Sequence, residues 1–158
     1  MNLRIGQGYD AHKLVPGDGM TLGGVKISSD YSIEAHSDGD IIIHALMDSL
    51  LGASGLGDLG SFFGTSEDSL KDVSSRDLLK RIVSKFKEDN ISIINVDITY
   101  IGEVPKVIEH VGLIRENLSK DLEIEKMAVS CKATTTDGMG FEGKKSGISC
   151  LAVSLIRI

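Results

Sequence analysis

Apolar residues recur with two different periods along the chain, and these periods predict its strands and helices. Runs with β-branched residues or period-two alternation occupy four segments: 3–15, 91–101, 127–135 and 147–158. The segment ISIINVDITYI at 91–101 gives the clearest strand. A short hairpin around Gly23-Gly24 is expected within 20–27, and the residues 28–35 are expected to form a polar connection.

Helical spacing of apolar residues marks three longer segments: 38–53, 75–89 and 105–118. Ser37 and Asp40 form an S-x-x-D capping box before the first helix, and Ser74 or Ser75 caps the second. Pro105 is expected at the first helical position of the third. A short helical turn is expected in 58–64, followed by a mobile acidic loop at 64–72, and a further loop at 136–146.

This order of elements predicts a single α+β domain over residues 1–158, an α/β sandwich in which a small mixed sheet carries helices on one face. The last strand, GISCLAVSLIRI, is apolar on both alternating sets, so both of its faces should be buried. Three helices cover only one face of a sheet. We therefore expect the other face to pack against further copies of the chain in a cyclic homo-oligomer. The alternative is a central strand that is covered within one chain.

Composition narrows the function classes. The chain is 41% hydrophobic and has a formal charge of −6, with three Tyr, four Phe and no Trp, which argues against a nucleic-acid surface. The two cysteines lie in apolar runs and are expected to be buried free thiols. The N-terminus resembles neither a signal nor a transit peptide, and no apolar run approaches bilayer length. These features are typical of a cytoplasmic protein.

Two polar clusters predict a metal site. Asp10 and His12 point to the same side if 3–15 is extended, because side chains alternate along a strand. Asp40, His44 and Asp48 lie four residues apart and form one polar stripe on the first helix. Together, Asp10, His12 and His44 give three ligands and leave one position of a tetrahedral zinc open, as in catalytic sites. The alternative is a solvated helix face with an ordinary histidine.

Other groups suit phosphate or sugar chemistry. The segment KATTTDG at 132–138 offers hydroxyls and loop amides for phosphate and Asp137 for a hard cation such as Mg²⁺, although it also fits a strand end with an Asx turn. Pro105-Lys106 could present backbone groups to a ligand or cap a helix. Asp58 and Gly60 could contact sugar hydroxyls, or Asp58 could cap a turn. Neither a P-loop nor a dinucleotide-binding glycine motif is present.

The motifs together resemble one family, the 2-C-methyl-D-erythritol 2,4-cyclodiphosphate synthases of isoprenoid biosynthesis. The resemblance is carried, in order along the chain, by IGQGYDAH (5–12), AHSDGDIIIHALMDSLLGASGLGDLG (35–60), NVDITYI (95–101) with Pro105-Lys106, and KATTTDGMGF (132–141).

The resemblance implies a homotrimer with active sites between subunits and no membrane or nucleic-acid partner. It implies a phosphorus–oxygen lyase that cyclises 4-diphosphocytidyl-2-C-methyl-D-erythritol 2-phosphate by attack of the 2-phosphate on the β-phosphate, releasing the cytidine nucleotide CMP. Asp10, His12 and His44 match the family's Zn²⁺ ligands. Asp137 matches the position that holds a Mg²⁺ or Mn²⁺ bridging the diphosphate.

The same resemblance assigns roles to further residues. His36 and Thr135 match the pair that stabilises the transition state. Substrate-binding positions, which include the metal ligands Asp10, His12 and Asp137, are matched by His36, Ser37, Asp58, Gly60, Phe63, Glu67, Gly102, Lys106, Val107, Ile108, Thr134, Thr135, Phe141 and Lys144. The backbone of Gly102 and of 106–108 would read the cytosine. We further infer that Asp40 and Asp48 orient the zinc histidines or the adjoining loop.

Four positions depart from the family pattern. Asp137 replaces a usual Glu, the loop FGTSE at 63–67 replaces F-P-D-T-D, Lys144 replaces an Arg, and Ser146 replaces an acid. The last two put isoprenoid-phosphate binding at a trimer axis in doubt, because Lys lacks the bidentate fork of Arg. Two other functions remain open: a zinc phosphohydrolase whose metal activates water, and an oligomeric metal- or ligand-binding module without turnover.

Overall fold

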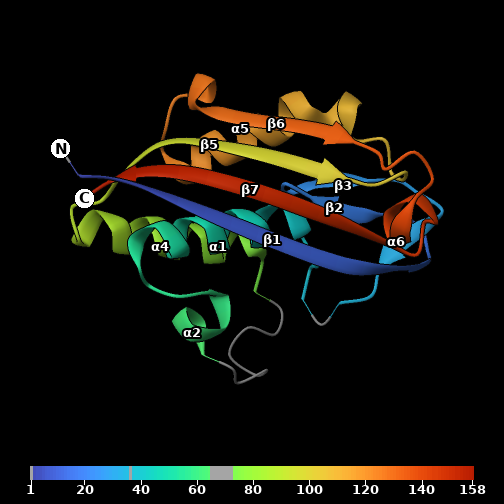
Figure 1. The fold of residues 1–158 in the computed structure, drawn as a ribbon, viewed down its shortest axis with the longest axis horizontal. Coiled ribbons are helices and arrows are strands. Elements are labelled where there is room, and N and C mark those ends of the chain that lie inside the picture. Colours follow the sequence, from blue (N-terminus) through green and yellow to red (C-terminus); the bar gives the residue numbers. More distant parts are fainter. Residues whose placement is uncertain (1, 36, 65–72) are drawn as a thin grey trace.

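One mixed sheet forms the frame of the molecule. The computed structural model describes residues 2–35, 37–64 and 73–158. Five strands lie in the order β4-β1-β7-β5-β6 (Figure 1). Their bounds are β1 Leu3–Pro16, β4 Tyr31–Ile33, β5 Ser92–Ile101, β6 Val129–Thr134 and β7 Gly147–Arg157. Only the β5–β6 pair is parallel among these strand pairs. A separate hairpin pairs β2 (Met20–Leu22) with β3 (Val25–Ile27).

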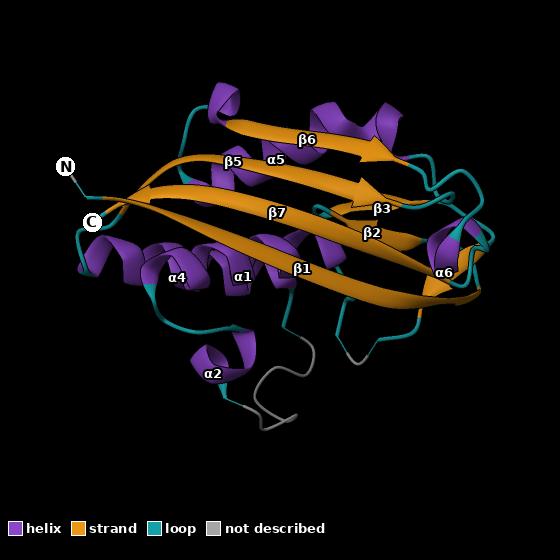
Figure 2. Ribbon diagram, in the orientation of Figure 1, coloured by secondary structure: helices purple, strands orange, loops and turns teal. Residues whose placement is uncertain are grey.

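The three long helices lie on one face of this sheet, as Figure 2 shows. They are α1 (Ile41–Ser54), α4 (Ser75–Glu88) and α5 (Val111–Leu122). Helix α1 packs on β1 and β7, α5 packs on β6, and α4 packs against both helices. The short elements are α2 (Leu59–Phe63), the 3₁₀ turns η1 (Val107–His110) and η2 (Lys126–Ala128), and α6 (Gly140–Gly143). The predicted α+β architecture, with helices on one face of a mixed sheet, is confirmed.

The core lies between the sheet and the helices. Residues Ile41, Ile42 and Ile43 at the start of α1 have no exposed surface, because α1 is enclosed by the sheet, α4 and the β2–β3 hairpin. Helix α4 buries a single apolar stripe, as its spacing predicted. Cys131 and Cys150 are buried free thiols, as expected, and burial raises the pKa of Cys131 to about 11. Within the described ranges, every helix is too short or too polar to cross a bilayer.

Two glycines of β1 allow α1 to approach the sheet closely. A Cβ at Gly6 would lie 1.9 Å from the Ser49 carbonyl oxygen, and one at Gly8 would lie 1.9 Å from the Ala45 carbonyl oxygen. Glycine is the residue that permits such an approach of two backbones. The period-two alternation then places Asp10 and His12 on the same face of β1 as these glycines, the face that is turned toward α1.

The second face of the sheet is uncovered in the single chain. Ile5 is 73% exposed, Tyr9 53% and Val153 42%, and all three are apolar or aromatic side chains on β1 or β7. The helices thus cover one face, as predicted. The second side of β7 is buried only in part, because Val153 is exposed and Leu151 and Leu155 are half-buried.

The two ends of the chain lie side by side. The antiparallel ladder of β1 and β7 runs from the pair Leu3–Arg157 to the pair Lys13–Gly147. The Ile158 amide also donates to the Asn2 carbonyl oxygen at 3.0 Å. Both ends therefore lie at one end of the ladder (Figure 1).

Three local predictions were wrong or incomplete. Asp40, not Ser37, caps α1, because its carboxylate accepts from the Ile43 amide at 3.2 Å. Gly39, immediately before it, has a positive φ, so the helix begins only at Ile41. Pro105 does not open a helix, because 103–105 form a bend and the first helical turn begins at Val107. The short β4 and α6 were not predicted, since three or four residues carry too little periodicity.

Candidate active site

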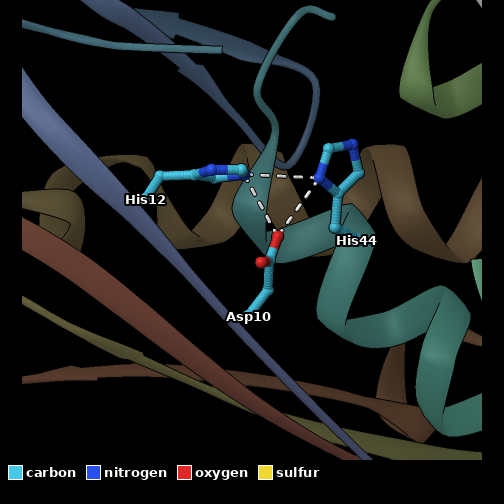
Figure 3. A group of neighbouring side chains, drawn as sticks. All are labelled: Asp10, His12 and His44. Atoms are coloured by element: carbon cyan, nitrogen blue, oxygen red, sulfur yellow. Dashed lines mark hydrogen bonds and ion pairs between the residues drawn. The ribbon is translucent and has the colours of Figure 1, made fainter. Parts of the chain in front are cut away.

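Asp10, His12 and His44 converge on one point, and we call these three residues the metal triad (Figure 3). Asp10 and His12 come from β1, and His44 comes from the first turns of α1. The Asp10 Oδ2 atom lies 3.1 Å from His12 Nε2 and 3.2 Å from His44 Nδ1. The two histidine nitrogens are 3.4 Å apart. The predicted ligand set is therefore assembled in space.

The spacing of these atoms fits a small tetrahedral ion. Zinc–ligand bonds of about 2.1 Å at tetrahedral angles place neighbouring donor atoms about 3.4 Å apart. The three measured separations, 3.1, 3.2 and 3.4 Å, match that edge. Two imidazoles and one carboxylate are also ligands that zinc accepts, and three protein donors leave a fourth position free. The chemistry of the donor set therefore fits the expected metal.

The charges and hydrogen bonds within the metal triad shift the pKa values of its members. Burial opposes ionisation of Asp10, but the hydrogen bonds and charges of His12 and His44 outweigh it and hold the Asp10 pKa below its ordinary value. For His44, burial lowers the pKa, yet the hydrogen bond and charge of Asp10 outweigh it and raise the pKa overall. The carboxylate thus stays ionised and available as a ligand.

The outer nitrogen of His44 also has a partner. His44 Nε2 lies 3.0 Å from the hydroxyl oxygen of Ser75, the first residue of α4. Ser75 is in turn held by both carboxylate oxygens of Asp38. Metal-binding histidines commonly have such an outer hydrogen bond. No pattern in the sequence predicts this contact, and only a helix-capping role was considered for Ser75.

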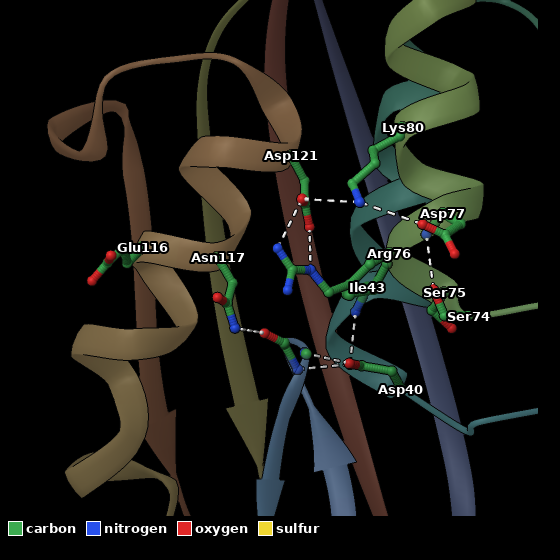
Figure 4. A network of polar contacts seen from close by, with 12 residues as sticks. Asp40, Ile43, Ser74, Ser75, Arg76, Asp77, Lys80, Glu116, Asn117 and Asp121 are labelled. Atoms are coloured by element: carbon green, nitrogen blue, oxygen red, sulfur yellow. Dashed lines mark hydrogen bonds and ion pairs between the residues drawn. The ribbon is translucent and has the colours of Figure 1, made fainter.

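Asp40 does not orient the zinc histidines, which corrects one prediction. It is fully buried, and its carboxylate accepts from the Gly23 amide at 2.8 Å and the Gly24 amide at 2.7 Å (Figure 4). Burial raises the pKa of Asp40 to about 6, although these amide donors favour the ionised form. Because Asp40 is the cap and not a helical residue, it turns toward the β2–β3 hairpin. Asp48 holds the following loop, as the other half of that prediction proposed, by accepting from the Leu59 amide at 2.9 Å.

A pocket of about 260 Å³ lies at the carboxyl ends of β5 and β6, and we call it the strand-end pocket. It contains seven residues singled out from the sequence: Gly102, Pro105, Lys106, Val107, Ile108, Thr134 and Thr135. It also contains three that were not: Tyr100, Glu103 and Ala133. The parallel β5–β6 pair brings the two strand ends together, which is why residues 30 positions apart share one pocket.

Tyr100 fixes the backbone of this pocket. It is 1% exposed, and its phenol donates to the Val104 carbonyl oxygen at 2.7 Å. A Cβ at Gly102 would lie 2.8 Å from the same phenol oxygen, so the loop passes directly over the ring. The Gly102 amide donates to the Thr134 carbonyl oxygen at 3.0 Å, which joins the loop to β6. Period-two alternation indicates that Tyr100 points inward, but no sequence signal gives its partner.

The strand-end pocket and the metal triad lie at the same level of the sheet. Across the strands, Thr134 pairs with Ile101, Ile101 with Ser149, and Ser149 with Ala11, which lies between Asp10 and His12. Three interstrand steps separate β6 from β1, which is about 14 Å. The two parts of the site are therefore near one end of the sheet but not in contact.

The remaining predicted residues are dispersed. Ser37 is exposed, Asp58 caps α2 by accepting from the Ser61 amide at 2.7 Å, and Gly60 lies within α2. Phe63 ends α2 and packs edge-on against Phe62. Asp137, Phe141 and Lys144 are exposed in the β6–β7 connection, apart from the metal triad. His36, Glu67 and most of the expected acidic loop fall outside the described residues.

Fold and site define a class of α+β proteins with an Asp-His-His metal triad between a strand and a helix, beside a separate strand-end pocket. The chain belongs to the YgbB family, whose model matches residues 3–157. It is 47% identical to the 2-C-methyl-D-erythritol 2,4-cyclodiphosphate synthase of Methylococcus capsulatus, over 97% of each chain. It is 44% identical to that of Marinobacter nauticus, over 98% of this chain and 97% of the relative.

Solved structures of related proteins support the same family. A CDP complex of IspF from Plasmodium falciparum is 39% identical, with a TM-score of 0.86, over 98% of this chain and 96% of that one. The bifunctional IspDF of Campylobacter jejuni gives a TM-score of 0.93 at 33% identity, over 98% of this chain and 42% of that longer one. The family expected from the motifs is therefore confirmed.

Proposed function

We propose that this chain converts 4-diphosphocytidyl-2-C-methyl-D-erythritol 2-phosphate to 2-C-methyl-D-erythritol 2,4-cyclodiphosphate with release of CMP. The observation that carries the proposal is the metal triad, whose donor atoms lie at tetrahedral spacing in a chain 47% identical to a synthase of that name. The family match over residues 3–157 supports one catalytic domain.

The metal triad would hold Zn²⁺, through Asp10 Oδ2, His12 Nε2 and His44 Nδ1. When bound, zinc supplies charge neutralisation and orientation for a phosphate oxygen at its free position. Asp137 would hold a Mg²⁺ or Mn²⁺ on the substrate diphosphate. Its exposed carboxylate, directly after three threonines, supports this role.

The strand-end pocket would bind the cytidine end of the substrate. Gly102 and Lys106 line a cavity of suitable size for one base, and Thr134 and Thr135, which also line it, would offer hydroxyls to the diphosphate. A related structure is described as a CDP complex, which supports a cytidine nucleotide as the ligand.

The main task of the protein in this reaction would be to hold the substrate in a bent conformation that brings its two reacting phosphates together. The attacking phosphate and the phosphorus under attack belong to the same substrate, so positioning alone can supply a large part of the rate. By resemblance, His36 and Ser37 hold the phosphorylated erythritol end, and Asp58 and Gly60 bind the sugar chain. Phe63, Glu67, Phe141 and Lys144 are further positions that match substrate-binding residues. His36 with Thr135 would stabilise the charge that develops in transfer.

The active unit would be a homotrimer in which each site uses two subunits. The uncovered face of the sheet, with Ile5 73% exposed and Tyr9 53% exposed, supports burial against further copies. The separation of the metal triad from the strand-end pocket supports shared sites, because a neighbouring subunit could bring its own pocket to the triad. The sedimentation coefficient of the purified protein tests the trimer directly.

The product assay decides between three functions. We expect mass spectrometry to find the cyclic diphosphate and CMP after incubation of substrate with zinc-loaded protein and Mg²⁺. A hydrolysed phosphate would identify the phosphohydrolase instead, and recovery of intact substrate would leave a binding module. His44→Ala should abolish turnover, whereas His110→Ala, which changes a histidine outside the metal triad, should retain it.

Mixed trimers test the shared site. His44→Ala and Thr135→Ala should each be inactive alone. If one site takes His44 from one subunit and Thr135 from the next, random mixed trimers regain about a quarter of the sites with both residues intact. No recovery after co-expression would place each site within a single chain.

A further inference from the structure

A chain of three side chains, His44, Ser75 and Asp38, links the metal triad to the start of α4. Ser75 is 1% exposed and begins α4. Its amide donates to Asp38 Oδ2 at 2.8 Å, its hydroxyl donates to Asp38 Oδ1, and its hydroxyl oxygen lies 3.0 Å from His44 Nε2. Asp38 lies just before α1 and Ser75 at the start of α4, so the contact joins the beginnings of two helices.

The direction of these hydrogen bonds follows from the number of protons available. A serine hydroxyl has one proton to donate, and an ionised carboxylate can only accept. Since Ser75 gives its proton to Asp38, its oxygen faces His44 Nε2 as an acceptor. Nε2 must then carry a hydrogen. The other nitrogen, Nδ1, is the one that faces Asp10 and His12.

We propose that Asp38 and Ser75 are positioning residues that fix His44 in the tautomer with Nε2–H, which leaves the Nδ1 lone pair for the metal. The inference rests on the proposed metal-binding function of the triad. Neither residue touches the ion: Asp38 orients the Ser75 hydroxyl, and Ser75 orients the imidazole. A histidine without this partner would spend part of its time with Nδ1 protonated or the ring turned.

Asp38→Asn separates this proposal from a purely structural role. The side chains have nearly the same shape, but the amide can donate to Ser75 Oγ while its oxygen keeps the Ser75 amide. The Ser75 hydroxyl would then donate to His44 Nε2 and favour the tautomer with Nδ1–H. Asp38→Asn reverses the hydrogen bond between Ser75 and His44, whereas Ser75→Ala only removes it. The reversal should therefore weaken metal binding more than the removal.

The test measures zinc binding on intact protein, by competition with a chromogenic chelator. Outer hydrogen bonds to metal ligands are typically worth about 10–100-fold in affinity. We expect Ser75→Ala to weaken zinc binding about tenfold, Asp38→Asn about 100-fold, and Ser75→Thr, which keeps the hydroxyl, less than about threefold. Ser74→Ala is the matched control: it removes the α4 cap, which accepts from the Asp77 amide, and should leave zinc affinity unchanged.

A spectroscopic measurement reports the tautomer itself. In metal-free protein labelled with ¹⁵N-histidine, the His44 nitrogen bonded to hydrogen should be Nε2 in the parent and Nδ1 in Asp38→Asn. Equal zinc affinity of the parent, Ser75→Ala and Asp38→Asn, with unchanged ¹⁵N shifts, would overturn the proposal. A parent protein that binds no zinc would instead overturn the proposed metal function on which it rests.

Discussion

Gly8 of β1 faces the Ala45 carbonyl oxygen of α1 so closely that a Cβ on Gly8 would lie 1.9 Å from it. Ala45 follows His44 in α1, and Gly8 lies two residues before Asp10 on the same face of β1. The separation of strand and helix at this point therefore also sets the separation of Asp10 and His44.

Gly8→Ala should accordingly damage both stability and the metal triad. The neighbour is backbone, so α1 or β1 must move, and we expect a loss of about 3 kcal/mol or more in the free energy of unfolding together with weaker zinc binding. Urea unfolding and chelator competition measure the two effects. Gly52→Ala is the control: its Cβ would meet only the Gln7 carbonyl oxygen, at 3.9 Å, and a helical Gly→Ala change should stabilise by up to about 1 kcal/mol. Equal stability of the two variants would contradict the close approach.

Tyr100→Phe should weaken binding of the cytidine end of the substrate. Removing the phenol leaves the Val104 carbonyl without its 2.7 Å donor and frees the loop above the ring. A net hydrogen bond of about 1 kcal/mol corresponds to about fivefold in the Kd for CDP, with kcat less affected than KM. Calorimetric titration with CDP measures it. Tyr31→Phe in β4, at the opposite edge of the sheet, should bind CDP like the parent; an unchanged Kd in both variants would remove the role given to Tyr100.

Zinc should stabilise the folded protein through the metal triad. A ligand at 100 times its Kd adds about 2.7 kcal/mol to the free energy of unfolding, which is about 5–10 °C in Tm for a chain of this length. Thermal unfolding with chelator and then with added zinc measures the shift. His44→Ala should show almost none of it, whereas His110→Ala should show all of it. A full zinc shift in His44→Ala would place the ion elsewhere.

Asp40 should make stability depend on pH. Burial raises its folded-state pKa to about 6, so the folded protein holds this proton more tightly than the unfolded chain, whose Asp pKa is about 3.9. The proton on the Asp40 carboxyl group contributes to the free energy of unfolding in full below about pH 4, and this contribution is lost as pH rises through about 6. Relative to Asp40→Asn, the parent should lose about 3 kcal/mol as pH rises through this range. Urea unfolding curves that differ by the same amount at every pH would argue against it.

Asp137→Ala should raise the Mg²⁺ concentration needed for activity. The substrate diphosphate still binds the ion, so we expect the midpoint of Mg²⁺ activation to rise about tenfold without abolishing turnover. Lys145→Ala, an exposed change in the same connection, provides the control. A Mg²⁺ titration that is identical in Asp137→Ala and the parent would exclude Asp137 as a ligand.

The sequence predicted those parts of the site that follow from local periodicity. Asp10 and His12 share a face because β1 is extended, and His44 follows from the family motif on an apolar helix. Contacts between distant segments could not be predicted this way. Ser75 lies 31 residues from His44, and only the packing of α4 on α1 brings the two together. Asp40 was misassigned because the i, i+4 rule holds within a helix, whereas Asp40 is the residue that caps it.

The neighbouring ends of the chain have a practical consequence for engineering. Asp10 lies seven residues along the β1–β7 ladder from Leu3, which is about 24 Å of extended strand. A second folded unit could be attached at either terminus without obstructing the metal, and a short linker could join the termini into a circular permutant. The bifunctional Campylobacter jejuni chain, of which this one covers 42%, is such a combination in nature.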